Sequence, residues 1–166
     1  YQIDGITAYE WREELDNWKE DVEFTMNYTQ VQDLSVIMVL DESASLGEDF
    51  EKVKQYASSF ITNVLAEIPN ARIGIVDFAD QIHSFPATNN KTALINYIAS
   101  LQQGPFTTLY ESVNVGIDML EDMDAEAKVL LVFTDGTDNN SDPEFTPTYI
   151  LDRLNNTTSD VKITSF

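Results

Sequence analysis

The sequence predicts an α/β fold: an open, doubly wound and mostly parallel sheet with helices on both faces, as in Rossmann-like proteins. Strand-like apolar runs alternate with segments whose apolar residues recur at helical spacing, which favours parallel strands joined by crossover helices. Two of the runs, residues 36–40 and 129–133, are continuously apolar, as is typical of strands buried on both faces. Each is followed closely by an acidic residue, Asp41 and Asp135 respectively.

Composition narrows the possible function classes. With 166 residues, of which 43% are hydrophobic, the chain can form one globular domain, and its apolar runs are shorter than the ~20 residues of a membrane helix. The net charge of −20 repels nucleic-acid phosphates and anionic membranes, so we expect neither partner. The absence of cysteine excludes a disulfide scaffold and a thiolate zinc site. A start at Tyr1 instead of Met indicates a mature or excised fragment.

Residues 1–33 differ in pattern from the rest of the chain. Trp11, Leu15, Trp18 and Val22 recur at helical spacing among acidic residues, which predicts an amphipathic helix followed by a connector. Its polar residues are mainly acidic, whereas a membrane-surface helix has a basic polar face, so packing against protein is favoured. We therefore divide the chain into residues 1–33 and a domain over residues 34–166.

The expected elements of the second part alternate regularly. They are a strand at 36–40, a helix at 48–66, strands at 71–78 and 81–85, helices at 91–101 and 109–120, a strand at 128–134, a helix at 146–154 and a strand at 161–166. A tight turn after residue 78 would make the short strand 81–85 antiparallel to its predecessor. Pro86 is expected to end that strand, which suits an edge position.

The loop after the first of these strands carries candidate ligands. In an extended chain, alternate residues point the same way, so Asp41, Ser43 and Ser45 can converge and offer oxygen ligands to a hard cation. The alternative is that Ser45-Leu46-Gly47-Glu48 is a capping box that starts the next helix. Taken alone, this loop favours helix capping over metal binding. A metal site would need further ligands from other loops. Parallel sheets bind small molecules and ions beyond the carboxyl ends of their strands, and Asp135 also lies at such an end.

Three motifs in this order resemble the metal-ion-dependent adhesion site of von Willebrand factor type A domains, namely Asp-x-Ser-x-Ser, a Thr on a second loop and an Asp after a later strand. The matching segments are Asp41-Glu42-Ser43-Ala44-Ser45, Gly104-Pro105-Phe106-Thr107-Thr108-Leu109-Tyr110 and Phe133-Thr134-Asp135-Gly136. The resemblance covers residues 34–166. It implies that Ser43, Ser45 and Thr107 contact Mg²⁺, or Mn²⁺ or Ca²⁺, directly, and that Asp41 and Asp135 act partly through water.

The sequence departs from the family pattern at three places. Ala44 stands where glycine is usual, and Pro105-Phe106 replaces the usual glycine before Thr107, so both Thr107 and Thr108 are candidate ligands. Because Thr108 and Glu111 have capping-box spacing, we assign capping to Thr108 and metal binding to Thr107. The chain also ends in what resembles the family's fifth strand, so the last strand and helix are expected to be missing and the domain to be C-terminally incomplete.

The expected function is metal-dependent protein binding or adhesion. Two carboxylates neutralise a divalent cation about once and leave a position for a partner's Asp or Glu. We therefore expect a binding module, not an enzyme, at the cell surface or outside the cell, a location that five Asn-x-Ser/Thr patterns also favour weakly. The alternatives are an intracellular type A module that assembles with an ATPase or another complex, and a Mg²⁺-dependent phosphohydrolase. The latter would have a second Asp where Ser43 stands.

Other polar residues receive more ordinary interpretations. Residues 138–142 resemble half of a calcium loop, but Pro143 and Tyr149 occupy the positions of its glycine and final glutamate, so a polar loop is expected. Asp77 and Asp80 are expected to form a turn, with a place near the metal ligands as the alternative. The single histidine, His83, is expected to be an ordinary surface or half-buried residue on an edge strand.

Overall fold

The computed structural model describes residues 8–12, 17–21, 33–156 and 161–165. The chain divides into two compact units, Tyr1–Gln30 and Val31–Phe166. In the described residues no helix combines the length and apolarity needed to cross a bilayer.

The first unit contains a β-hairpin where the sequence predicted a helix. Strands β1 (Ala8–Arg12) and β2 (Asn17–Asp21) pair antiparallel, with Trp11 opposite Trp18. The predicted helix is therefore wrong at these residues. A spacing of seven places two residues on one face of a helix, but it also places them opposite each other when the chain reverses between them. Leu15 and Val22, which belonged to the same prediction, lie outside the described residues.

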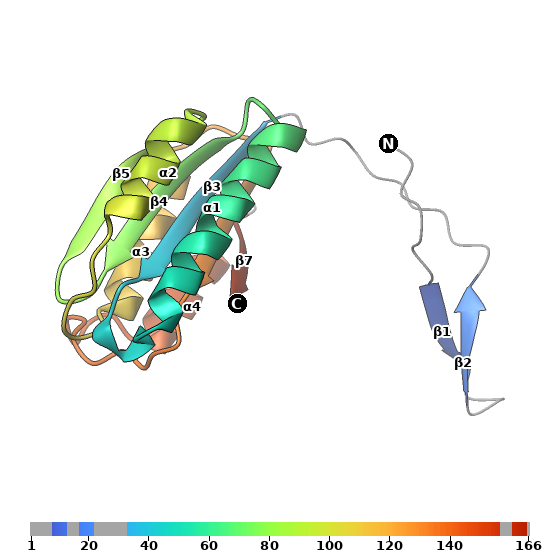
Figure 1. The fold of residues 1–166 in the computed structure, drawn as a ribbon. Coiled ribbons are helices and arrows are strands. Elements are labelled where there is room, and N and C mark those ends of the chain that lie inside the picture. The colour runs from blue at the N-terminus through green and yellow to red at the C-terminus, as the bar shows by residue number, and fades with distance from the viewer. Residues whose placement is uncertain (1–7, 13–16, 22–32, 157–160, 166) are drawn as a thin grey trace. The chain divides into compact units, whose positions relative to one another are not determined.

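The second unit is built on a five-stranded sheet in the order β5-β4-β3-β6-β7. Figure 1 shows β5, β4 and β3 side by side in this sheet. Strand β3 pairs parallel with β4 and β6, β7 pairs parallel with β6, and only β5 is antiparallel. The predicted sheet, mostly parallel with one antiparallel edge strand, is thus confirmed. Its strands are β3 (Leu34–Asp41), β4 (Arg72–Phe78), β5 (Ile82–Thr88), β6 (Ala127–Phe133) and β7 (Val161–Ser165).

Helices cover both faces of this sheet, as predicted. They are α1 (Asp49–Glu67), α2 (Lys91–Ser100), α3 (Leu109–Glu121) and α4 (Pro147–Asn156). Side chains alternate along β3, so Met38 and Leu40 join the apolar core beneath α1 and α2, whereas Ile37 and Val39 join the core beneath α3 and α4. This explains why β3 is apolar at every position from 36 to 40.

Helix α3 approaches the sheet closely at Gly116. A Cβ atom at this position would lie 2.7 Å from Leu130 Cδ1 and 3.1 Å from Val39 Cγ2, closer than packed carbon atoms tolerate. The glycine therefore lets α3 rest directly on β3 and β6. Because α3 begins just after Thr107 and Thr108, its position also fixes the loop that carries these residues.

Strand β5 continues past Pro86, although Pro86 was expected to end this strand. Phe85 pairs with Ile75 and Thr88 with Ile73, with an irregularity in register between the two pairs. Proline has no N–H group for the ladder, and an irregularity on an edge strand accommodates it. The expected strand end is therefore wrong by three residues.

Candidate metal centre

Three loops meet at the carboxyl end of the central strands. They follow β3, precede α3 and follow β6, and the strand order reverses at β3, the point where open α/β sheets place their ligands. A hollow of about 300 Å³ opens between the loops. Its lining comes from all three loops and comprises Ser43, Ala44, Ser45, Phe106, Thr107, Gly136, Thr137 and Asn139.

Oxygen atoms from the loops after β3 and β6 form a connected set. Asp41 is fully buried, and its carboxylate accepts the N–H of Ser43 at 2.7 Å and the hydroxyl of Thr134 at 2.6 Å. The hydroxyl oxygens of Ser43 and Ser45 lie 2.8 Å apart. Ser45 also donates to Asp135 Oδ1 at 3.3 Å. Residues separated by 90 and 93 positions in the chain thus meet within hydrogen-bonding distance.

The third loop brings Thr107 to the same place. A Cβ atom at Gly136 would lie 3.6 Å from Thr107 Oγ1 and 3.5 Å from Asp41 Oδ2, so both side chains border this glycine. Asn139 holds the backbone of Thr107 at both ends: its side-chain oxygen accepts the Thr107 N–H at 2.8 Å, and its N–H donates to the Thr107 carbonyl at 3.0 Å. All five residues predicted as ligands therefore surround one site. Their role in binding a metal stays a prediction.

The hydroxyl of Ser45 does not cap a helix. Helix α1 begins at Asp49, its N-cap is Glu48, and no side chain caps it. A short 3-10 turn at Ala44–Leu46 precedes it instead. The capping alternative for Ser45 is therefore wrong, because the local pattern that suggested it is interrupted by this extra turn, and the hydroxyl is turned toward Ser43 and Asp135.

The capping box predicted for Thr108 is also wrong. Its hydroxyl donates to the carbonyl of Ala79 at 2.6 Å and makes no bond to the start of α3. Asp138, from the loop after β6, caps α3 instead by accepting the N–H of Tyr110 at 2.8 Å. Ser141 accepts the N–H of Glu111 at 3.1 Å. Sequence reasoning missed these contacts because it considered only residues adjacent in the chain.

The loop after β6 is therefore a structural clamp. Besides capping α3, Asp138 accepts hydrogen bonds from both the N–H and the hydroxyl of Ser141. Its two carboxylate oxygens are thus engaged by protein donors, which agrees with the interpretation of residues 138–142 as a polar loop. The clustering of Asp, Asn and Ser directly after Asp135 was the one signal in the sequence that this loop has such a role.

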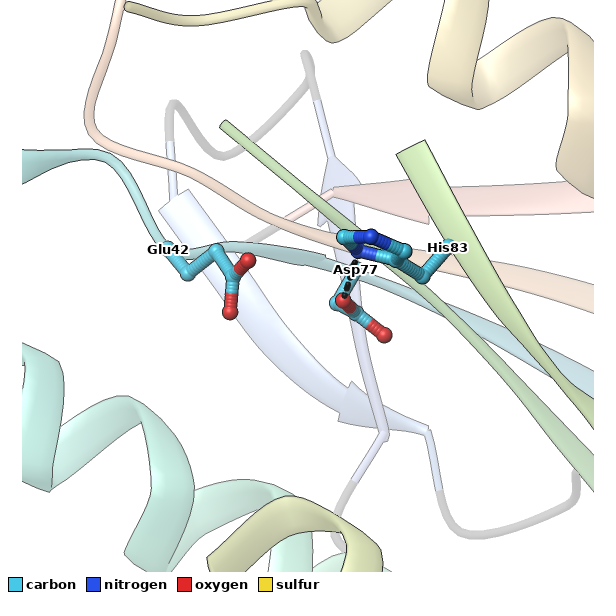
Figure 2. Close-up of side chains that lie close together, drawn as sticks. All are labelled: Glu42, Asp77 and His83. Atoms are coloured by element: carbon cyan, nitrogen blue, oxygen red, sulfur yellow. Dashed lines mark hydrogen bonds and ion pairs between the residues drawn. The ribbon is translucent and has the colours of Figure 1, made fainter. Parts of the chain in front are cut away.

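A second cluster lies beside the first, formed by Glu42, Asp77 and His83 (Figure 2). One potential ligand atom from each residue lies within 4.8 Å of those of the other two. Asp77 Oδ1 accepts the hydroxyl of Tyr97 at 2.6 Å, and Asp77 Oδ2 lies 3.2 Å from His83 Nδ1. The expectation that Asp77 forms a turn is wrong: it is a buried residue of β4, and the turn is closed by the N–H of Ala79 and the carbonyl of Gln81.

This crowding changes the proton affinity of the groups involved. Burial, together with the nearby charge of Asp77, raises the pKa of Glu42 to about 7. Burial and the hydrogen bond to Asp77 also raise the pKa of Tyr97 above its ordinary value. Glu42 thus lies between Asp41 and Ser43 in the sequence, but its pKa depends mainly on burial and on the charge of Asp77.

Comparison with known families decides the identity of the fold. The sequence model for the von Willebrand factor type A domain matches residues 35–163. The chain belongs to this family. Type A domains generally act as adhesion or protein-interaction modules and not as enzymes, and many bind a divalent metal. The fold and the order of the three loops in the second unit are those expected from the resemblance.

Solved structures with the same fold include proteins of bacterial pili. The vWF domain of the type V pili tip protein Mfa5 from Porphyromonas gingivalis is 19% identical, with a TM-score of 0.62, over 66% of this chain and 40% of that one. The pilus adhesin SpaC from Lactobacillus rhamnosus GG is 18% identical, with a TM-score of 0.58, over 66% and 15% of the two chains.

A third similar structure is the conserved hypothetical protein BatB from Bacteroides thetaiotaomicron. It is 17% identical, with a TM-score of 0.64, over 80% of this chain and 65% of that one. The type A domain therefore spans less than two thirds of the length of each of these three structures. A comparison of the sequence with curated proteins finds no match.

Proposed function

We propose that this type A domain binds a partner protein through a divalent cation held by Asp41, Ser43, Ser45, Thr107 and Asp135. The observation that carries the proposal is that hydroxyl oxygens from two loops line one hollow, and that the carboxylates of Asp41 and Asp135 lie next to these residues. Oxygen ligands of this kind suit Mg²⁺, Mn²⁺ and Ca²⁺. The cation would serve as an electrophile that accepts an oxygen ligand from outside the domain.

Burial divides the five residues into a base and a rim. Asp41, Ser43 and Thr107 are buried, whereas Ser45 and Asp135 are exposed. A cation held between base and rim would be accessible to a partner at the surface. Phe106, which also lines the hollow, is exposed and offers an apolar contact beside that position.

The net charge of −20 makes a carboxylate ligand dependent on the cation. An acidic side chain that approaches so negative a protein is repelled unless a local positive charge offsets the field. We therefore propose that the partner offers an Asp or Glu, and that binding is lost when the metal is chelated. A location at the cell surface or outside the cell fits this role, and two of the similar structures come from proteins described as a pili tip protein and a pilus adhesin.

Calorimetric titration of the 166-residue chain with Mg²⁺, Mn²⁺ and Ca²⁺ tests the metal site. We expect binding by the wild type and its loss in Asp41→Asn and Ser43→Ala, because the first change removes a negative charge and the second removes a hydroxyl ligand. Ser84→Ala, at an exposed hydroxyl on β5, is the control and should bind normally. Binding that is absent from the wild type, or unchanged in both ligand variants, would overturn the proposal.

The clamp on Thr107 gives a second test of the same site. Asn139→Ala removes the side-chain oxygen that accepts the Thr107 N–H, so metal affinity should fall roughly 10–100-fold although no ligand is lost. Asn140→Ala is the matched control, because Asn140 donates to Thr108 and not to Thr107. Equal affinities for the two variants would show that the position of Thr107 does not matter.

The carboxylate partner can be examined with a small probe. Mn²⁺-loaded protein should enhance the relaxation of water protons, and acetate should reduce this enhancement by displacing water from the ion. Acetamide, which has the same shape without the negative charge, should have a much smaller effect. Equal effects of the two molecules would argue against a carboxylate ligand while leaving the metal site itself intact.

A further inference from the structure

We propose that Glu42, Asp77 and His83 form a second divalent-cation site, distinct from the first and selective for ions that accept a nitrogen ligand, with Zn²⁺ as the preferred ion. The site is built by three neighbouring strands: Glu42 directly follows β3, Asp77 lies in β4 and His83 in β5. It does not depend on the proposed adhesive function, since it shares no ligand with the first site.

The ligand atoms already lie close to coordination distances. Asp77 Oδ2 and His83 Nδ1 are 3.2 Å apart, and ligands of one tetrahedral zinc ion lie roughly 3.3 Å apart. All three ligand atoms fall within 4.8 Å of one another, so a modest rotation of the Glu42 side chain would complete the set (Figure 2). An ion bound there would take the place of the hydrogen bond between Asp77 and His83.

Among the described residues, neither carboxylate is paired with a permanently charged cation; the only basic group beside them is His83, which is charged only when protonated. Glu42 is 8% exposed and Asp77 2% exposed, and neither forms an ion pair with Lys or Arg among the described residues. In the described part of the chain, no side chain hydrogen-bonds Glu42, which is bonded only by the backbone of Gln102. Two ionised carboxylates buried side by side would be costly, and a divalent cation would offset the charge of both when it displaces the proton of Glu42.

The surroundings also orient the ligands. Tyr97 donates to Asp77 Oδ1, which leaves Oδ2 directed toward His83, and metal-binding carboxylates are commonly held by such a neighbouring donor. The backbone of Glu42 is fixed by its N–H bond to Phe78 and by the bond that its carbonyl accepts from Gly104, both 2.9 Å long. The side chain of His83 is 56% exposed and provides a path from solvent.

The donor set predicts which ion binds at each site. An imidazole nitrogen with two carboxylates suits Zn²⁺ and related transition metals, whereas Mg²⁺ and Ca²⁺ prefer oxygen ligands alone. The first site offers only oxygen from its five residues. Glu42 follows Asp41 directly in the chain. Because side chains alternate along an extended chain, the Glu42 side chain points away from those of Asp41 and Ser43 and toward β4 and β5.

The single histidine of the chain makes the test direct, because its ring nitrogens give one set of NMR signals. We expect Zn²⁺ to shift the ¹⁵N resonance of His83 Nδ1 in the metal-free 166-residue protein, and millimolar Mg²⁺ to leave it unchanged. Glu42→Gln and Asp77→Asn should each weaken the Zn²⁺ effect more than about tenfold. Asp80→Asn, at an exposed acid near the same edge, is the control and should behave as wild type.

The outcomes separate this site from the first one. Ser43→Ala should retain the Zn²⁺-dependent shift, and His83→Asn, an exchange of an exposed side chain, should remove zinc binding heat while leaving Mg²⁺ binding intact. A shift that is absent in the wild type, or that persists at the same Zn²⁺ concentration in both carboxylate variants, would overturn the proposal. In the second case His83 would bind zinc alone, as an exposed histidine does.

Discussion

Successive side chains at the end of β3 serve two different clusters. Asp41 accepts hydrogen bonds from Thr134 and from the N–H of Ser43. Glu42, which lies between Asp41 and Ser43 in the chain, clusters instead with Asp77 and His83. In the motif Asp-x-Ser the middle residue counts only as a spacer. Here the residue at that position carries a buried carboxylate, and its environment is set by the neighbouring strands β4 and β5.

The protonation of Glu42 should make stability depend on pH. Its pKa is about 7 in the folded chain and 4.5 ordinarily, so between these values the folded state binds more protons than the unfolded state. The free energy of unfolding should therefore fall as pH rises from about 4.5 to 7, by roughly 1–2 kcal/mol after allowance for solvent screening. Urea denaturation of wild type and Glu42→Gln in EDTA measures this contribution.

The difference between the two proteins isolates Glu42 from the other acids. Glu42→Gln should gain stability relative to wild type as pH rises through this window, and the exposed Glu48→Gln should not. Parallel pH profiles for wild type and Glu42→Gln would contradict the expected coupling. In the presence of Zn²⁺ the sign should reverse, because the wild type would then gain from binding an ion that the variant binds weakly.

The candidate ligands could be predicted from the sequence, but the residues that hold them could not. Asp41, Ser43 and Ser45 lie at fixed spacing after an apolar run, and Asp135 follows a second such run. The bonds from Asn139 to Thr107 join residues about 30 positions apart, and they depend on how two loops meet. Thr108 and Glu111 have the spacing of a capping box, but in the folded domain the Thr108 hydroxyl donates to the carbonyl of Ala79.

At the scale of the element, the position of α3 depends on the absence of a side chain at Gly116. In Gly116→Ala the new methyl group would meet Leu130 and Val39, so we expect a loss of roughly 1–3 kcal/mol from overpacking. Higher helix propensity offsets about 1 kcal/mol of this loss. Denaturant unfolding should therefore show a net decrease in stability of up to about 2 kcal/mol and, because α3 begins at the Thr107 loop, weaker metal binding.

A surface substitution provides the comparison for this change. Asn96→Ala, at an exposed position of α2, alters propensity without entering the core and should leave stability unchanged or slightly raised. If Gly116→Ala stabilised the protein to the same extent, Leu130 would have to move aside at little cost, and the close approach of α3 would not matter for the site.

The helices and strands of the second unit were predictable because their apolar residues recur at regular spacing and are the residues buried in the core. Alternation of strands and helices and the two continuous apolar runs were sufficient to predict a parallel sheet covered on both faces. In the first unit, Trp11 and Trp18 are compatible with either a helix or a hairpin, and spacing alone could not decide between them. Pro86 predicted an edge strand correctly but not the irregularity that lets the strand continue.

For the molecule as a whole, the net charge of −20 is a source of self-repulsion. Raising the NaCl concentration from about 0.01 to 0.1 M shortens the Debye length from roughly 30 to 10 Å, so the temperature of unfolding should rise. Scanning fluorimetry in EDTA measures this shift. A double variant, Glu144→Lys and Asp152→Lys, changes two exposed acids and should respond less to salt. A midpoint that does not depend on salt would show that the charges are too dispersed to matter.

The sheet has an uneven edge at β5, where Pro86 contributes no N–H and the register with β4 is irregular. An incoming strand from another molecule needs a regular row of donors and acceptors to dock. We therefore expect that β5 does not pair with a strand from another molecule. Copies held at high local density would then remain individual folded molecules and would not merge into continuous sheets along this edge.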